Sequence, residues 1–282
     1  MLRFPVVTTL VLSVVLGAEP TSCRDAFGPG RSHRPWPNEP PQFELISDYG
    51  FEDPIAVTPD ELPLGGSSWF VQRNPVGNGS QATDSAAPLS APSVYQVTYP
   101  IGFLSGLTPS TLQYYLIPGR RELYWGFWWK PSNPFQSDGS GVNKIVFLWT
   151  QTVTGNATDL LYFDLSPNPW RIRAMNDLIG GNGPTAGRRL EPNVDTTAIT
   201  LGEWHRIEIY AKYSTDPVAN GVLMWWVDGR LNGAFRNLKM APDDGFRYLQ
   251  IAPTFGGNTG DVKLQTDHYW FDHIRVSRPR TP

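Results

Sequence analysis

The 282-residue sequence predicts an all-β protein, an antiparallel two-sheet jelly-roll sandwich, and three observations support this fold class. Glycine and proline contribute 27 residues each, which leaves little room for long helices. Aromatic residues make up 13% of the chain and hydrophobic residues 40%, enough to bury a sizeable core. From about residue 43 onward, short segments of alternating apolar and polar residues recur between turn-rich clusters, which is typical of strands.

Composition and charge exclude several classes of protein. Lys and Arg number 23 against 26 Asp and Glu, a net charge of −3, so no basic excess is present to hold a nucleic-acid backbone. The single cysteine excludes an internal disulfide framework and a cysteine-cluster metal site. The hydrophobic and tryptophan content excludes a disordered chain. No dimerisation motif is present, so we expect a monomer.

The N-terminal residues 1–22 predict a signal peptide, because one positive charge precedes a short apolar run that ends in small residues. Cys23 follows directly, as in a bacterial lipoprotein signal, where this cysteine would carry the lipid. The alternative is cleavage after Ala18, which leaves Cys23 as an unpaired thiol. Both alternatives predict a secreted or cell-surface protein, and a lipid anchor would be its one contact with a membrane.

The rest of the chain divides into three parts. Residues 23–42 are rich in Pro, Gly and charged side chains and predict a tether. Residues 43–277 form the predicted jelly-roll domain, and residues 278–282 form a tail. The strands expected within the domain, in chain order, are residues 43–46, 93–99, 122–130, 144–150, 160–165, 170–174, 204–213, 221–227, 248–252 and 268–276.

Alternation along these strands assigns side chains to faces. In residues 144–150, Ile145, Phe147 and Trp149 are predicted to face the core. His205 shares a face with Ile207, which predicts a buried, structural histidine. Amphipathic or polar side chains that point outward are Tyr124, Trp128, Lys144, Tyr162, Asp164, Arg171, Arg173, Tyr210 and Trp226. The dipeptide 228–229, Asp-Gly, predicts a tight hairpin turn.

Eight stretches occur in the order seen in one family of extracellular enzymes. They are residues 50–52 (GFE), 96–102 (QVTYPIG), 122–130 (ELYWGFWWK), 143–145 (NKI), 202–207 (GEWHRI), 220–229 (NGVLMWWVDG), 255–257 (FGG) and 269–274 (YWFDHI). With them the chain resembles the concanavalin A-like jelly-roll polysaccharide lyases, especially the alginate and glucuronan lyases. The resemblance covers about residues 43–277. It implies a β-sandwich with a carbohydrate cleft, although a shared fold does not fix the chemistry.

The outward residues favour β-elimination over hydrolysis. A retaining glycosidase needs two neighbouring carboxylates, and Asp164 is the one outward carboxylate of its segment. The resemblance implies that Lys144 is the cleft lysine, and that Tyr162-x-Asp164 and Arg171-x-Arg173 follow where the family has Ser-x-Arg and Tyr-x-Tyr. We therefore expect Lys144, Tyr162, Arg171 and Arg173 to be catalytic, with Tyr162 carrying the proton and the cations neutralising a sugar carboxylate. The alternative for Arg171 and Arg173 is that they are ordinary solvated residues.

Sugar binding and metal binding give further candidates. The residues expected to bind substrate are Tyr124, Trp128, Asp164, Tyr210 and Trp226, the aromatic ones by stacking on sugar rings. The resemblance also implies a structural calcium ion held by Glu52 and Asp272. In the alternative, Asp272 caps a loop or pairs with Arg275. The elimination chemistry itself requires no cofactor.

Three functions follow from these patterns. The first is an extracellular polysaccharide lyase-like protein that acts on an acidic, uronate-containing glycan by β-elimination. The second is a non-catalytic, lectin-like surface module that binds carbohydrate. The third is a structural or adhesion protein that uses the jelly roll without a sugar site. In the first two readings the partner is a polysaccharide, and none of the three involves nucleic acid.

Overall fold

The computed structural model describes residues 35–57, 68–73, 77–150, 160–176, 189–215, 217–240 and 245–280. The predicted signal peptide and Cys23 lie outside these residues. No helix in the described ranges is long and apolar enough to cross a membrane. The compact unit that contains the described fold runs from Trp36 to Pro282.

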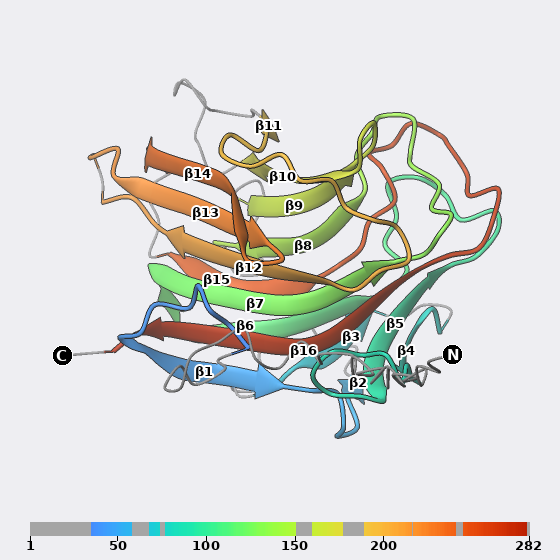
Figure 1. Ribbon diagram of the computed structural model, residues 1–282, viewed down its shortest axis with the longest axis horizontal. Coiled ribbons are helices and arrows are strands. Elements are labelled where there is room, and N and C mark those ends of the chain that lie inside the picture. The colour runs from blue at the N-terminus through green and yellow to red at the C-terminus, as the bar shows by residue number, and fades with distance from the viewer. Residues whose placement is uncertain are drawn as a thin grey trace, which may run out of the picture. The chain divides into compact units, whose positions relative to one another are not determined.

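The described residues are all-β, as predicted, and form 16 strands in two sheets of eight (Figure 1). Sheet A has the order β14 (Arg230–Leu238), β13 (Gly221–Val227), β12 (His205–Lys212), β7 (Glu122–Pro131), β16 (Asp267–Pro279), β5 (Ser93–Tyr99) and β4 (Gly79–Thr83), with β1 (Phe43–Tyr49) also paired to β16. Sheet B has the order β11 (Arg189–Leu190), β10 (Arg171–Asn176), β9 (Leu160–Ser166), β8 (Lys144–Trp149), β15 (Phe246–Ile251), β6 (Thr111–Arg120), β3 (Phe70–Arg73) and β2 (Ala56–Val57). Apart from the parallel β2–β3 pair, neighbouring strands are antiparallel.

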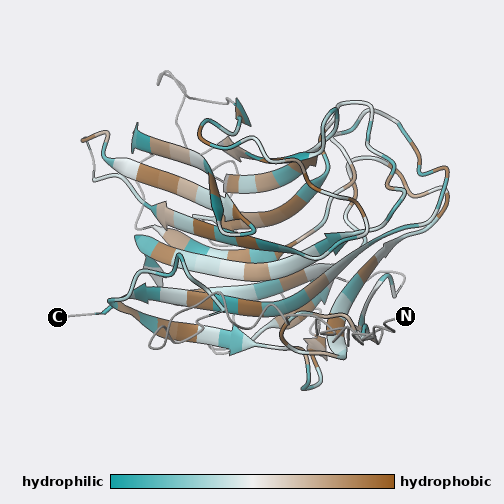
Figure 2. Cartoon of the chain, in the orientation of Figure 1, coloured by the Kyte–Doolittle hydropathy of each residue, from teal (hydrophilic) through white to brown (hydrophobic). Residues whose placement is uncertain are grey.

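The hydrophobic core lies between the two sheets. Trp125 on β7 packs against Trp69 beside β3, with ring centroids 6.3 Å apart, and Trp225 on β13 packs against Phe163 on β9 at 5.7 Å. Figure 2 shows the alternation that builds this core, with brown and pale residues succeeding one another along the front strands. The predicted inward residues of segment 122–130 all lie in the core: Leu123, Trp125, Phe127 and Trp129.

A β-bulge in β8 makes one facing prediction wrong. The register with β9 shifts between Lys144 and Val146, so Ile145 and Val146 both enter the core. The extra residue reverses the alternation after it. Phe147 and Trp149 therefore lie on the outer face of sheet B, not in the main core, and stack on each other at 5.7 Å.

The folded unit begins before the predicted boundary at Phe43. Trp36 is 2% exposed and is buried against the outer face of sheet A. Asn38 donates two hydrogen bonds to the carboxylate of Glu208, each 3.0 Å long. At the other end, β16 continues to Pro279, past the predicted end of the domain. The last residues of the predicted tether are thus part of the fold.

The hairpin between β13 and β14 confirms the predicted turn and explains a buried histidine. Asp228 (φ 51°) and Gly229 (φ 81°) take the left-handed conformation that such turns require. The Asp228 carboxylate lies 2.7 Å from Nδ1 of His205 and accepts the backbone N–H of Arg206 at 2.8 Å. His205 is 4% exposed, and its Nε2 lies 3.0 Å from the carbonyl oxygen of Thr200. His205 is therefore buried and structural, as predicted.

We expect His205 to make the stability of the protein depend on pH. Burial opposes its charge, but the Asp228 carboxylate and the Thr200 carbonyl outweigh burial and raise the pKa of His205. The folded state then holds this proton more tightly than the unfolded chain. The contribution of the protonated His205 to the free energy of unfolding is complete below the unfolded pKa of about 6.5. It is lost as the pH rises through the pKa of His205 in the folded protein.

His205→Gln should remove this part of the pH dependence of stability. At acidic pH it should lower the free energy of unfolding by about 1–3 kcal/mol. Urea unfolding of the two proteins over a pH series measures the difference in free energy. Parallel profiles for wild type and variant would contradict the prediction.

Candidate functional site

The outer face of sheet B carries a continuous row of aromatic side chains, here called the aromatic row. Its members are Phe70, Tyr115, Tyr248, Trp149, Phe147 and Tyr162. Neighbouring rings lie 5.5–5.7 Å apart from β3 across to β9. Trp149 is partly buried and the other members are buried. Because five of the six rings are buried, they pack as a layer on the sheet, and Trp149 is the member whose ring is most accessible to a sugar.

Amide side chains run beside the aromatic row. Trp149 Nε1 donates to Gln250 Oε1 at 3.1 Å, which fixes the plane of the indole. Gln113 Nε2 donates to Gln72 Oε1 at 2.7 Å. The other polar atom of Gln113, its Oε1, is buried and has no hydrogen-bond partner among the described residues, and the residue as a whole is 1% exposed. A buried acceptor without a donor is energetically costly, and this one lies beneath the surface, out of reach of a bound sugar.

Lys144 and Tyr162 meet on this face, as the sequence predicted. Lys144 is the first residue of β8, immediately before the bulge, and is paired in register with Asp164 on β9. Its Nζ lies 5.1 Å from the ring centroid of Tyr162 and 5.9 Å from that of Phe147. A cation thus stands over the β9 end of the aromatic row.

Arg173 is committed to a buried ion pair. Its Nε and Nη2 donate to the two oxygens of Asp164 at 2.8 and 2.9 Å, and Nη2 also donates to the carbonyl oxygen of Gly141 at 2.7 Å. Asp164 is 1% exposed, and burial raises its pKa despite the arginine. The pair leaves neither Arg173 nor Asp164 available to a substrate.

Arg171 is the arginine of the predicted pair that remains available. It lies opposite Ser166 and is partly buried, and within the described part of the chain it forms no ion pair; its Nε is buried, so a ligand could meet only the outer end of the guanidinium. The expectation that Arg171 and Arg173 bracket a carboxylate together is therefore corrected. Lys144 and Arg171 flank the neutralised Asp164–Arg173 pair instead.

The other residues expected to stack on sugars lie on the opposite sheet. They are Tyr124, Trp128, Tyr210 and Trp226, all on strands of sheet A. Tyr124 is fully buried beneath Trp36 and Phe43, and its Oη donates to Glu208 at 2.7 Å. It cannot stack on a sugar, because the segment before β1 covers it. None of the four belongs to a site with Lys144.

Asp272 performs the loop-capping role that was the alternative to calcium binding. Its two oxygens accept the backbone N–H groups of Leu89 and Ser90 at 2.7 and 3.1 Å. Glu52 is exposed, and the described part of the chain contains no group of three or more His, Cys, Asp or Glu side chains that could hold a metal. Because N–H donors surround the carboxylate of Asp272, this arrangement does not fit a calcium ion.

Ser90, His273 and Asp48 have the composition of a hydrolase triad. Ser90 Oγ lies 2.7 Å from His273 Nδ1, and His273 Nε2 lies 2.5 Å from Asp48 Oδ1. Acyl transfer also needs N–H donors aimed at a developing oxyanion. The N–H groups of Leu89 and Ser90 already bind the Asp272 carboxylate, which would repel a second negative charge. The hydrogen bonds of Ser90, His273 and Asp48 therefore link β1 to β16, and they do not form a hydrolytic site.

Comparisons with known proteins agree with this fold. No protein-family model and no curated protein matches the sequence. A marine alginate lyase of family PL-14 from Aplysia kurodai matches at a TM-score of 0.57 and 11% identity, over 85% of this chain and all of that one. An alginate lyase from Chlorella virus matches at 0.53 and 12%, over 71% and 89% of the two chains. An endo-β-1,4-glucuronan lyase from Trichoderma reesei matches at 0.50 and 19%, over 76% and 91%. The likeness confirms the jelly-roll fold.

Proposed function

We propose that this protein is an extracellular polysaccharide lyase-like enzyme that acts on an acidic, uronate-containing glycan by β-elimination. The observation that carries the proposal is the Lys144 ammonium over the Tyr162 ring, at one end of the aromatic row. The fold shared with proteins named as alginate and glucuronan lyases supports it. A polysaccharide is the proposed partner and the active form is a monomer.

The elimination needs a proton carrier and cations. A base removes the proton on C5 of a uronate, the electron pair forms the C4–C5 double bond, and the C4–O bond breaks as the leaving oxygen takes a proton. Lys144 and Arg171 supply positive charge that stabilises the carboxylate as its α-carbon is deprotonated. Tyr162 moves the proton, because it carries an acid–base group on the side chain that lies next to Lys144. No cofactor takes part.

The direct test is incubation with a panel of uronate polymers and neutral glucans. The unsaturated sugar at the new chain end absorbs in the ultraviolet, so product formation is followed by absorbance. We expect product from at least one uronate polymer and none from the glucans. A panel without product would contradict the enzymatic proposal.

A non-catalytic, lectin-like module is the second candidate. The observation that favours it is the Asp164–Arg173 pair, which removes one predicted cation from the face while the aromatic row stays intact. Binding of a polysaccharide with no unsaturated product distinguishes this candidate from the first.

Export completes the proposal. The signal-like residues 1–22 support secretion or display at the cell surface. Cys23 is the proposed site of a lipid anchor.

We expect Arg171→Ala to weaken binding of uronate oligosaccharides by about 10-fold to 100-fold, the effect of losing one charged hydrogen bond. Binding of neutral oligosaccharides should change little. Isothermal titration calorimetry measures both. Arg206→Ala removes an arginine from the outer face of sheet A and is the matched control. Equal losses for acidic and neutral ligands would contradict an acidic substrate.

A further inference from the structure

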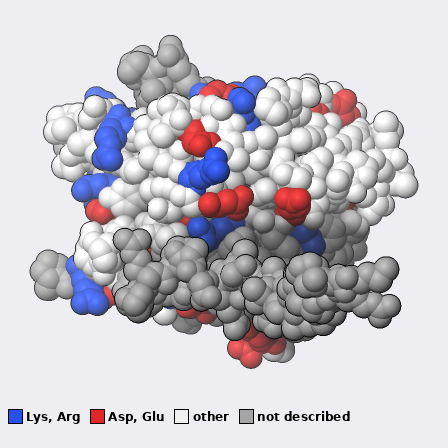
Figure 3. Space-filling model, in the orientation of Figure 1, with Lys and Arg blue, Asp and Glu red and all other residues white. Residues whose placement is uncertain are grey.

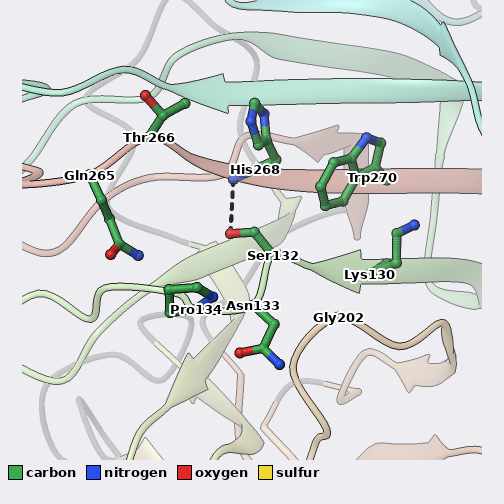
Figure 4. A pocket seen from close by; sticks show the side chains of 9 residues that line it. All are labelled: Lys130, Ser132, Asn133, Pro134, Gly202, Gln265, Thr266, His268 and Trp270. Atoms are coloured by element: carbon green, nitrogen blue, oxygen red, sulfur yellow. Dashed lines mark hydrogen bonds between the residues drawn. The ribbon is translucent and has the colours of Figure 1, made fainter.

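A hollow opens on the outer face of sheet A, on the side of the sandwich opposite to the aromatic row. Its volume is about 530 Å³, and it lies where β7 ends and β16 begins. The main lining residues, drawn in Figure 4, are Lys130, Ser132, Asn133, Gln265, His268 and Trp270. Sites for small ligands have volumes of about 300–1,000 Å³, so the hollow has room for a ligand of this class.

The aromatic wall of this pocket is held in place before any ligand arrives. Trp270 Nε1 donates to Gln96 Oε1 at 2.8 Å. The Nζ of Lys130 lies between two indoles, 4.7 Å from the centroid of Trp270 and 4.9 Å from that of Trp204. The backbone N–H of His268 donates to Ser132 Oγ at 3.1 Å. A site ordered in advance loses less entropy when it binds.

The polar groups around the pocket carry no net charge. Lys130 forms an ion pair with Asp84, which also accepts Trp204 Nε1 at 3.2 Å. Burial lowers the pKa of His268, which keeps its imidazole neutral at neutral pH. On the same face, Figure 3 shows acidic and basic atoms in small neighbouring groups, with a wide uncharged area toward the right. Among the described residues that line the pocket, no cation is left unpaired to hold a carboxylate or a phosphate.

Neutral hydrogen-bonding groups remain available. The side chains of Asn133 and Thr266 make no hydrogen bond within the described part of the chain, and both residues are exposed. Gln265 donates to Asp267 at 2.7 Å through its Nε2, so its carbonyl oxygen is left as an acceptor. Together these groups offer an amide, a hydroxyl and a carbonyl next to the indole of Trp270.

We infer that this pocket binds a neutral sugar unit of a glycan. The C–H groups of a pyranose pack against Trp270 and His268, and its hydroxyls pair with Asn133, Thr266 and Gln265. The inference does not depend on elimination chemistry at Lys144. One molecule could hold a neutral chain on sheet A while sheet B faces an acidic chain.

The test is calorimetric titration of the full-length protein with neutral gluco-, manno-, xylo- and galacto-oligosaccharides, and separately with uronate oligosaccharides. We expect binding of at least one neutral probe, and a loss of about tenfold or more for Trp270→Ala and for Asn133→Ala with Thr266→Val. Leu264→Ala is the matched control, because Leu264 is 76% exposed on the same loop and does not line the pocket. Leu264→Ala should bind the neutral probe as the wild type does.

Three results would overturn the inference. They are failure of every neutral probe to bind, competition by uronates for the same site, and unchanged affinity in the pocket variants. Where Trp270→Ala does not fold, the double variant decides, because Asn133 and Thr266 are both exposed. Absence of an elimination product tests the proposed function alone and leaves this inference standing.

Discussion

Tyr162→Phe is expected to lower the rate of elimination by about 10²-fold to 10⁴-fold, the usual contribution of a general acid–base group. The substitution keeps the ring, which packs 5.5 Å from Phe147 and lies beneath Lys144. Glycan affinity should therefore stay nearly constant while the maximal rate falls. Rates come from absorbance of the unsaturated product, and affinity from calorimetry on the same oligosaccharide.

Tyr248→Phe is the matched control for this variant. It removes the same hydroxyl from the same aromatic row, but Tyr248 lies on β15, and Trp149 separates it from Phe147 and Tyr162. We expect its rate to stay close to that of the wild type. A Tyr162→Phe protein with full activity would move proton transfer to another residue. A loss of affinity without a loss of maximal rate would make Tyr162 a binding residue only.

The alternation of apolar residues could predict the core but not an insertion within a strand. In segments 122–130, 160–165 and 204–213 each strand keeps its period of two, and the predicted inward residues lie in the core. In β8 the bulge after Lys144 adds one residue, and every later side chain changes face. Uninterrupted alternation predicts Phe147 and Trp149 in the core, and the bulge is the reason why that prediction is wrong.

The candidate site could be predicted only in part, because alternation separates inside from outside but does not say which sheet a strand joins. Tyr124 and Lys144 both point outward from their strands, yet the strands belong to different sheets. The sequence also does not predict which residues of two strands lie opposite each other. Arg173 lies opposite Asp164 because of the register between β9 and β10. Gln250 follows the alternation of β15 and could have been found as an outward amide.

Lys263→Met is expected to destabilise the protein by about 3–5 kcal/mol, the usual cost of breaking a buried ion pair. The Lys263 side chain is fully buried, and its Nζ lies 2.6 Å from Asp267 Oδ2 and 2.6 Å from the carbonyl oxygen of Gln136. The ring centroid of Phe135 lies 3.9 Å from the same ammonium. Methionine fills the space but leaves the Asp267 carboxylate buried without its cation.

A double variant separates the lost ion pair from lost packing. Adding Asp267→Asn to Lys263→Met removes the uncompensated charge, so the double variant should recover most of the stability. Urea unfolding at neutral pH measures all three proteins. A double variant as unstable as Lys263→Met would show that packing, and not the unpaired charge, causes the loss.

Because of Lys263, we expect the free energy of unfolding of the wild-type protein to rise at alkaline pH. Burial lowers the pKa of Lys263 from 10.5 to about 8, and Asp267 offsets only part of this effect. Between these two values the unfolded chain binds more protons than the folded protein, so the free energy of unfolding increases with pH. Below the folded pKa the cost of burying the charge is complete, and it disappears as the pH approaches the unfolded value.

Buried tyrosines such as Tyr269, whose pKa is raised well above 10.0, act in the opposite direction, but wild type and Lys263→Met share them. The difference between these two proteins should therefore widen by about 2–3 kcal/mol from pH ~8 to pH ~10, and a constant difference would show that Lys263 keeps its proton in both states.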